Sequence, residues 1–192
     1  MLLYFCVLIL IMKFTKKRFF DLLWVVAIAI VIIPSSRAWL LKVISFSPSI
    51  ENVSERIPIS SYDWKLKGLN TSDVNFETLK NKVVFVNFWA TWCPGCVAEK
   101  PSIQALYNDY KNKVVFLTVT NETKEVVAAY FQKKGYNLPA YNMITREPKE
   151  LSTENIPTSF VINKKGLIVI KSGRADWNTD KIRDFLDSLL AD

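Results

Sequence analysis

The sequence predicts an α/β domain with a mixed central sheet flanked by helices, preceded by an apolar N-terminal segment. Three observations support this fold class: short β-branched and aromatic runs alternate with helical patterns, a hairpin signal follows them, and an amphipathic helix ends the chain. The length of 192 residues suits one domain with an appendage. The hydrophobic fraction of 50%, with only five Gly and eight Pro, excludes a disordered chain.

Composition and charge exclude several classes of function. The chain has no His, which removes Ser-His-Asp triads, Cys-His dyads and HExxH zinc sites. Proton transfer must therefore use Cys, Asp, Glu, Lys or Tyr. The first 50 residues hold six basic side chains against one acidic side chain, whereas the remainder holds 19 against 17. Because basic and acidic side chains are nearly balanced after residue 50, we expect no basic surface there and no nucleic-acid binding.

Residues 1–46 are predicted to form a membrane anchor. Two apolar runs, residues 1–12 and 22–33, flank a basic patch at residues 13–18. The stretch from 19 to 41 has the length of a single membrane-spanning helix, with its charged residues near the ends. A cleaved signal peptide and a hairpin of two membrane segments are alternatives, and Met12 competes with Met1 as the start.

The basic patch also predicts on which side of the membrane the body lies. Basic segments next to a membrane span stay in the cytoplasm, so the residues after the second apolar run should be extracytoplasmic, on the periplasmic side. Residues 47–61 are polar and contain two Pro, which is typical of a linker. Residues 62–192 then form the folded domain.

The first half of this domain is predicted to contain two strands, a helix and a third strand, in this order. Residues 62–69 alternate apolar and polar side chains, as a half-buried strand does. The runs at 83–90 and 114–120 are almost wholly apolar and predict strands buried on both faces. Between them, a helix is expected over 93–110, with Pro101 inside it.

The second half adds a helix, a hairpin and a last helix. Residues 123–134 predict a helix that Gly135 ends. Strands at 159–163 and 167–171 flank a turn signal at 164–166. The amphipathic pattern of 178–190 predicts the terminal helix. This order implies a mixed sheet with helices on both faces.

The chemistry concentrates where the second strand ends and the first helix begins. The sequence there reads Trp92-Cys93-Pro94-Gly95-Cys96. Two Cys three residues apart at a helix N-terminus can close a small disulfide ring, and the helix end lowers the pKa of the outer thiol. We therefore expect Cys93 to be the attacking thiolate and Cys96 to resolve the mixed disulfide. The intervening Pro-Gly pair tunes the reduction potential.

Three other interpretations of the cysteine pair are weaker. A zinc site needs four ligands, and the chain offers only Cys6 in addition. A structural disulfide would close a very small loop, which removes little unfolded-state entropy. A pair of inert core cysteines is disfavoured by Pro94 and Gly95 between them. Redox chemistry by the cysteines alone, without metal or cofactor, remains.

Three further residues are candidates for the same site. Glu99 follows Cys96 by three residues, so on a helix it lies on the same face and could exchange a proton with Cys96; the alternative is a solvated helix residue. Asn87 lies in the middle of a buried strand and is either a structural amide or part of the site. Pro157, in Ile156-Pro157-Thr158, reads from the sequence alone as a turn residue, since few X-Pro bonds are cis.

Together, the motif from Asn87 to Cys96, Glu99 with Pro101, and Ile156-Pro157-Thr158 resemble the thioredoxin superfamily. The closer likeness is to membrane-tethered TlpA/ResA-type thiol–disulfide oxidoreductases, over about residues 60–190. The resemblance implies a thioredoxin-like fold with an added N-terminal hairpin, a cis Pro157 facing the disulfide, and a functional Glu99. Thioredoxins proper carry Asp at the position of Asn87, so a cytosolic thioredoxin is disfavoured.

The resemblance also implies a reaction and partners. The domain would reduce disulfides in exported proteins, among them apocytochrome c before haem attachment, with electrons from a membrane thiol donor. Three alternatives stay open: a thiol oxidase that donates its disulfide, a peroxiredoxin-like peroxide reductase, and a non-enzymatic membrane-tethered binding module. The peroxiredoxin signature would need Pro where this chain has Val86.

Overall fold

The computed structural model describes residues 19–25, 47–51 and 55–192. The chain divides into two units, Met1–Ile44 and Ser45–Asp192. In the first unit, residues 19–25 are helical, and the rest of the predicted anchor, with its basic patch and Cys6, lies outside the described residues. Among the described residues, no helix has both the length and the apolar character that crossing a bilayer requires.

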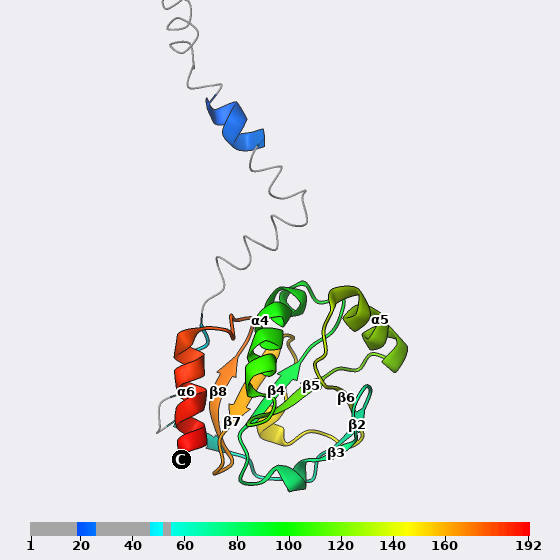
Figure 1. Cartoon of the computed structure of the whole chain (residues 1–192), viewed down its shortest axis with the longest axis vertical. Helices are drawn as coiled ribbons and strands as arrows, with labels where there is room; N and C mark the ends of the chain where they lie inside the picture. The colour runs from blue at the N-terminus through cyan, green and yellow to red at the C-terminus, as the bar shows by residue number, and fades with distance from the viewer. Residues whose placement is uncertain (1–18, 26–46, 52–54) are drawn as a thin grey trace, which may run out of the picture. The chain divides into compact units, whose positions relative to one another are not determined.

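An eight-stranded mixed sheet organises the second unit, in the order β1-β8-β7-β4-β5-β6-β2-β3. The strands are β1 (Ile57–Pro58), β2 (Lys65–Gly68), β3 (Val74–Asn75), β4 (Val84–Phe88), β5 (Val115–Val119), β6 (Ala140–Met143), β7 (Thr158–Ile162) and β8 (Leu167–Ser172). The strands β4, β5 and β6 run parallel to one another, and β7 is antiparallel to β4 (Figure 1). This places β4, the strand before the cysteines, in the middle of the sheet.

Local sequence signals explain where the helices begin and end. The helices are α4 (Pro94–Tyr110), α5 (Lys124–Lys134) and α6 (Asp180–Ala191), with short 3₁₀ helices η2 (Phe76–Leu79) and η3 (Lys149–Leu151). Pro94 occupies the first position of α4, where its missing N–H costs no hydrogen bond. Gly135 ends α5 with a φ of 70°, a conformation that glycine adopts easily. The Thr179 side chain caps α6 by accepting from the Ile182 N–H.

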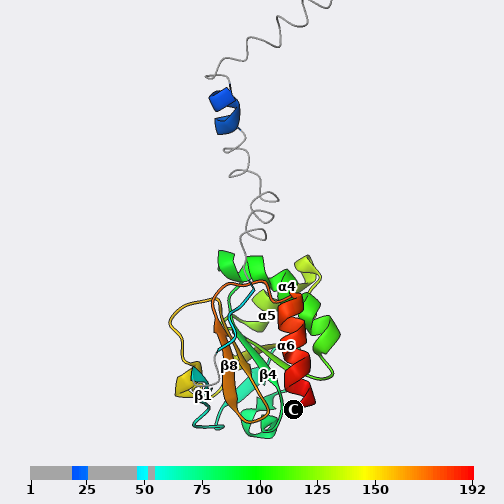
Figure 2. The same ribbon diagram turned by 90° about the vertical axis from the view of Figure 1, so that its left-hand side faces the viewer.

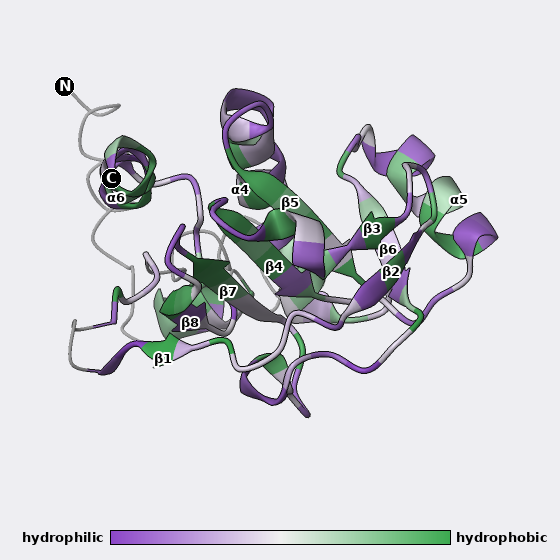
Figure 3. Ribbon diagram, turned by 90° about the horizontal axis from the view of Figure 1, so that it is seen from below, coloured by the Kyte–Doolittle hydropathy of each residue, from purple (hydrophilic) through white to green (hydrophobic). Residues whose placement is uncertain are grey.

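The sheet is covered differently on its two faces, as Figure 3 shows. On one face, buried side chains of α4, α5 and α6, such as Ile103, Phe131 and Leu186, pack with Phe85 of β4. On the other face, Phe76 and Leu79 of η2 and Leu151 of η3 pack with the alternate residues of the strands. The prediction of α-helices on both faces is therefore only partly correct, because short 3₁₀ helices and loops cover the second face.

The predicted strands, helices and C-terminal hairpin are present, and β2 with β3 forms the expected N-terminal hairpin. The segment 47–61, which we expected to be a linker, instead contributes to the domain. Its β1 pairs with β8 at the sheet edge (Figure 2), and Ile59 is buried in the core. Residues 47–51 also bond to the domain, through the Glu51 N–H to Val169 O at 2.9 Å.

Candidate active site

The two cysteines lie at the start of α4, just past the end of β4. Cys93 is the N-cap of the helix, and its Sγ accepts a hydrogen bond from the Cys96 N–H at 3.2 Å. The two residues form a disulfide, with their Cα atoms 5.2 Å apart. Cys96 has no exposed surface and Cys93 has 4%, while the neighbouring Trp92 is 72% exposed. The pair is thus placed at a helix N-terminus with Cys93 as the outer residue.

The loop before β7 meets the cysteines. The Ile156–Pro157 peptide bond is cis, as the resemblance implied, and Ile156 O lies 3.7 Å from Cys93 Sγ. A Cβ atom added to Gly95 would come within 3.1 Å of Pro157 Cδ. The absence of a side chain at position 95 therefore lets the loop approach the helix more closely, by a few tenths of an ångström, than a Cβ atom would allow.

One helical turn after Cys96, side chains of α4 join a buried polar network centred on Asn87. Its Nδ2 donates to Glu99 Oε1 at 2.8 Å and to Ser159 Oγ at 2.9 Å. Its Oδ1 accepts from Lys100 Nζ at 2.9 Å. The second Glu99 oxygen accepts from the Ala175 N–H at 3.4 Å. Asn87 therefore links the two ionisable side chains, and Glu99 is a buried residue rather than a solvated one.

Burial shifts both ionisable groups of this network towards neutrality. Burial raises the pKa of the Glu99 carboxyl to about 7, against the opposing effects of Lys100 and of the hydrogen bonds from Asn87 and Ala175. Burial likewise lowers the pKa of the Lys100 ammonium, and the Glu99 charge opposes that shift. A carboxyl group that ionises near neutral pH can act as a base or an acid under ordinary conditions.

Sequence reasoning missed Lys100. A signal for it existed, because Cys96, Lys100 and Ile103 follow the spacing of a single buried helix face. Lysine on a helix is usually solvated, which hid this signal. Among the described residues, no cluster of three or more His, Cys, Asp or Glu side chains could hold a metal ion.

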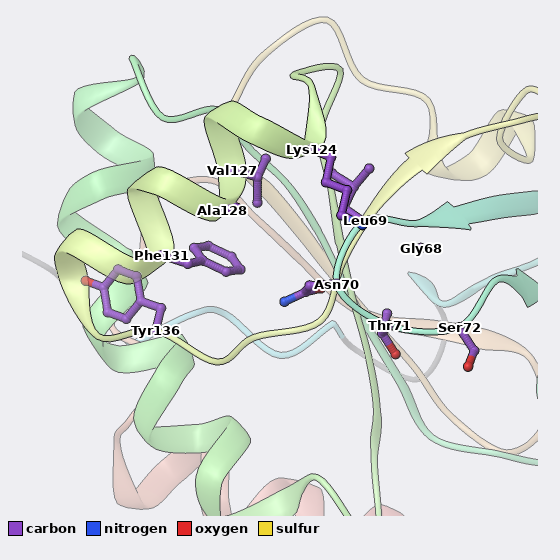
Figure 4. A pocket seen from close by; sticks show the side chains of 10 residues that line it. All are labelled: Gly68, Leu69, Asn70, Thr71, Ser72, Lys124, Val127, Ala128, Phe131 and Tyr136. Carbon is purple, nitrogen blue, oxygen red and sulfur yellow. The ribbon is translucent and has the colours of Figure 1, made fainter.

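The cavities in the described part of this domain include the following two. One, of about 310 Å³, borders the cysteine site, with Trp92 and Ile156 in its wall together with the carboxylates of Glu122 and Glu147. The other, of about 690 Å³, lies between α5 and residues 68–72, and its wall includes Asn70, Lys124 and Tyr136 (Figure 4). None of the cysteine-site residues lines this larger cavity.

Comparisons with known sequences give one family. The family described as "AhpC/TSA family" matches residues 58–171. Similar curated proteins are the thiol-disulfide oxidoreductase ResA of a Bacillus cereus strain, 35% identical over 106 residues, and that of Bacillus subtilis (strain 168), 32% identical over 107 residues. Each match covers 54% of this chain, and 61% and 60% of the respective relative. The chain thus spans about three fifths of the length of these relatives.

Similar solved structures support the fold. A DsbF homologue from Corynebacterium diphtheriae superposes with a TM-score of 0.59 at 18% identity, covering 74% of this chain and 92% of the other. A thiol:disulfide interchange protein of the thioredoxin family from Chlorobium tepidum TLS gives a TM-score of 0.53 at 24% identity, covering 67% and 96%. At these identities the likeness establishes the thioredoxin-like fold alone, which the sequence had predicted.

Proposed function

The chain belongs to the AhpC/TSA family of the thioredoxin superfamily, and from this premise we propose that it is a thiol–disulfide oxidoreductase. Its redox centre would be the Cys93–Cys96 pair, and its substrates would be disulfides in other proteins. One observation carries this proposal: the outer cysteine caps a helix N-terminus and its sulfur lies against the loop before β7, so one sulfur is both activated by the helix end and placed beside Ile156 and Pro157.

The geometry supports a two-step exchange. In the reduced protein, the α4 N-terminus and the Cys96 N–H stabilise a Cys93 thiolate. This thiolate attacks a substrate disulfide, forms a mixed disulfide and releases one substrate thiolate. The Cys96 thiol then loses its proton and attacks Cys93 Sγ, which releases the second substrate thiolate. Two electrons pass to the substrate, its sulfurs take up two protons, and the enzyme is left with the disulfide.

Glu99 would accept the Cys96 proton in the second step. It lies on the same helix as Cys96, one turn further along, and is buried with it. A carboxyl group whose pKa is raised by burial matches the thiol better as a proton acceptor than an ordinary carboxylate does. Pro157 would hold the substrate segment beside Cys93, and Trp92 is exposed at the same place.

We further propose that the domain is extracytoplasmic and membrane-anchored and that it acts as a reductase. The basic patch between two apolar runs of the sequence supports this location. The reductive direction and clients such as apocytochrome c rest on the resemblance to TlpA/ResA-type proteins. Reduction would then require a membrane thiol donor to return electrons to the disulfide.

A peroxide reductase is less well supported. Val86, where the peroxiredoxin signature needs Pro, lies in the middle of β4 between β5 and β7, paired with Leu117 and Phe160. A proline there would remove a hydrogen-bond donor from a central strand. A peroxide-consumption assay with the reduced full-length chain separates this alternative from disulfide exchange.

The test is a trapping experiment with the full-length chain in detergent, in a Cys6→Ser background. Cys96→Ser should accumulate mixed disulfides with exported proteins, because the resolving thiol is gone, and Cys93→Ser should accumulate none. Equal trapping by both variants, or none by either, would contradict the proposal. The reduction potential decides direction: about −250 mV or lower fits a reductase, and about −120 mV fits an oxidase.

A further inference from the structure

Lys100 is a lysine without exposed surface, and the exchange described above gives it no task. Its Nζ donates to Asn87 Oδ1 at 2.9 Å and lies 3.7 Å from the centre of the Trp89 ring. Both contacts favour the charged ammonium form of Lys100. Asn87 Oδ1 accepts a hydrogen bond from the ammonium group, and the negative face of the Trp89 ring attracts its charge. Burying a lysine is costly unless a partner compensates its charge, and the charge that acts on Lys100 in this way is that of Glu99.

The contacts of Asn87 connect Lys100 to Glu99. A side-chain amide has one oxygen and one NH₂ group, and a donor on one side fixes which way the group points. Because Lys100 donates to Oδ1, the NH₂ group of Asn87 is turned towards Glu99 and Ser159. Without Lys100, the amide could rotate and place an oxygen against the Glu99 carboxylate. Lys100 therefore acts on Glu99 in two ways, through its charge and through the orientation of Asn87.

We propose that Lys100 is a positioning residue for disulfide exchange, which keeps the Glu99 carboxylate ionised and oriented to accept the Cys96 proton. This role rests on the proposed function. In the resolving step, the proton moves from Cys96 Sγ to a Glu99 oxygen, and the Cys96 sulfur bonds to Cys93 Sγ while the bond from Cys93 to the substrate sulfur breaks. Glu99 then gives up the proton to solvent or to the leaving thiolate.

Lys100 provides the main compensating charge for Glu99. From α4, the charge of Lys100 acts on the carboxyl group. The other neighbours are neutral donors: the Asn87 amide of β4, the Ser159 hydroxyl of β7 through Asn87, the Ala175 N–H and the Trp177 indole. Arg174 and Asp176, beside Ala175, are partly exposed. From α5, Tyr130 packs against Trp89, and burial raises the pKa of its phenol to about 12, so it stays neutral.

The test compares Lys100→Met with Lys100→Gln in the full-length chain. Methionine keeps the length of the side chain without its charge, whereas glutamine keeps an N–H donor for Asn87. The matched control is Lys111→Met, at the exposed C-terminal end of the same helix. The Glu99 carboxyl is titrated by carbon-13 NMR of the oxidised protein, and the rate of resolution is followed from preformed mixed disulfide between about pH 5 and 9, the range that spans both coupled groups.

We expect Lys100→Met to raise the midpoint of the Glu99 titration by about one pH unit or more. Because the ionised fraction of Glu99 at pH 7 falls, resolution at that pH should slow by about fivefold or more, with the rate of Cys93 attack unchanged. Lys100→Gln should shift the Glu99 midpoint in the same direction but by less. Lys111→Met should not shift it. A folded Lys100→Met protein with an unchanged Glu99 titration would overturn the proposal, as would an equal slowing when Glu99 is already Gln.

A reciprocal measurement keeps the proposal testable should both Lys100 variants fail to fold. Coupling between two titrating groups is mutual, so Glu99→Gln should lower the pKa of the Lys100 ammonium, read from its nitrogen-15 shift. An unchanged Lys100 titration would overturn the coupling. A wild-type chain without exchange activity would overturn the proposed function and this role with it, whereas an active chain with uncoupled titrations would overturn this role alone.

Discussion

At the scale of single residues, the two cysteines differ because of where the helix begins. Cys93 is outside the first turn and receives the Cys96 N–H, whereas Cys96 is inside the helix and fully buried. Cys93 is therefore the cysteine whose thiolate is stabilised, and it is also the one that keeps some exposed surface. The other polar side chains of the site, Asn87, Glu99, Lys100 and Ser159, are buried as well.

This difference predicts selective alkylation. In the reduced full-length chain at pH 7, with Cys6 replaced by Ser, iodoacetamide should modify Cys93 and leave Cys96 unmodified, because the reagent needs an accessible thiolate. Mass spectrometry of the digested protein gives the modified position. Preferential modification of Cys96 would reverse the roles of the two cysteines.

Glu99 predicts a pH dependence of the resolving step. The carboxylate is the active base, and burial raises its pKa to about 7, so the rate should rise with pH through this value. Glu99→Gln should slow resolution at pH 7 by about tenfold to a hundredfold, within the usual range of general-base effects. It should also remove that rise. An unchanged rate and profile would leave Glu99 without a role in exchange.

The raised pKa of Glu99 also affects stability. Between pH 4.5 and about 7, the folded chain binds more protons at this carboxyl group than the unfolded chain does. The contribution of Glu99 to the free energy of unfolding is therefore present below pH 4.5 and is lost as the pH rises to about 7. Urea titrations should show this decrease for the wild type and a smaller one for Glu99→Gln. Parallel curves would contradict it.

At the scale of elements, α4 and the loop before β7 approach each other at Gly95. Replacement by Ala adds a methyl group 3.1 Å from Pro157 Cδ, so Pro157 must shift by a few tenths of an ångström. We expect Gly95→Ala to slow mixed-disulfide formation several-fold, while a gain in helix propensity of up to about 1 kcal/mol offsets the loss of stability.

Gly173→Ala is the control for this variant. Its added methyl group would lie 3.8 Å from Pro157 O, an ordinary contact distance, so its rate of mixed-disulfide formation should equal that of the wild type. Stopped-flow measurements with a model disulfide compare the two variants. Equal rates for Gly95→Ala and Gly173→Ala would show that the close approach at position 95 has no effect on exchange.

The sequence predicted the elements whose own pattern is strong and missed those that neighbours create. The apolar run of β4 and the cap signals of α5 are local, and both elements were found. By contrast, β6 has four residues, follows Pro139, and is a strand because β5 and β2 pair with it from both sides. The two-residue β1 likewise depends on its pairing with β8.

The residues of the site also fall into those that the local sequence reveals and those that depend on distant parts of the chain. The positions of Cys93 and Cys96 follow from their spacing and from the end of β4, so the sequence alone located them. The cis bond before Pro157 needed the family resemblance, because the sequence by itself favours a turn. Lys100 was missed, because its burial depends on Asn87 and Trp89, which belong to another part of the chain.

At the scale of the whole molecule, the segment that precedes the hairpin is part of the fold. Ile59 is 8% exposed and belongs to the same core cluster as Ile168, whereas Ile57 on the same segment is 55% exposed. Further towards the N-terminus, Ser47 Oγ lies 3.0 Å from Thr179 Oγ1, and Lys181 Nζ donates to Pro48 O at 3.3 Å. The segment is thus attached to both β8 and α6.

These contacts predict that the segment stabilises the domain. Ile59→Ala in the full-length chain should lower the free energy of unfolding by about 2–3 kcal/mol, because it leaves a cavity in the core. Ile57→Ala, at an exposed position of the same segment, should change it by about 0.5 kcal/mol or less. Urea denaturation followed by tryptophan fluorescence measures both. Similar small values for the two variants would mean that the segment is only a connection.

The complete burial of Cys96 has a consequence for the kinetics of the proposed enzyme. Since that sulfur has no exposed surface, the substrate and the electron donor must both react at Cys93, one after the other. The substrate reacts with the reduced form and the electron donor with the disulfide form, so the two partners meet Cys93 in turn and never at the same time. Turnover should then follow a double-displacement scheme, in which the protein itself carries the electron pair between two encounters.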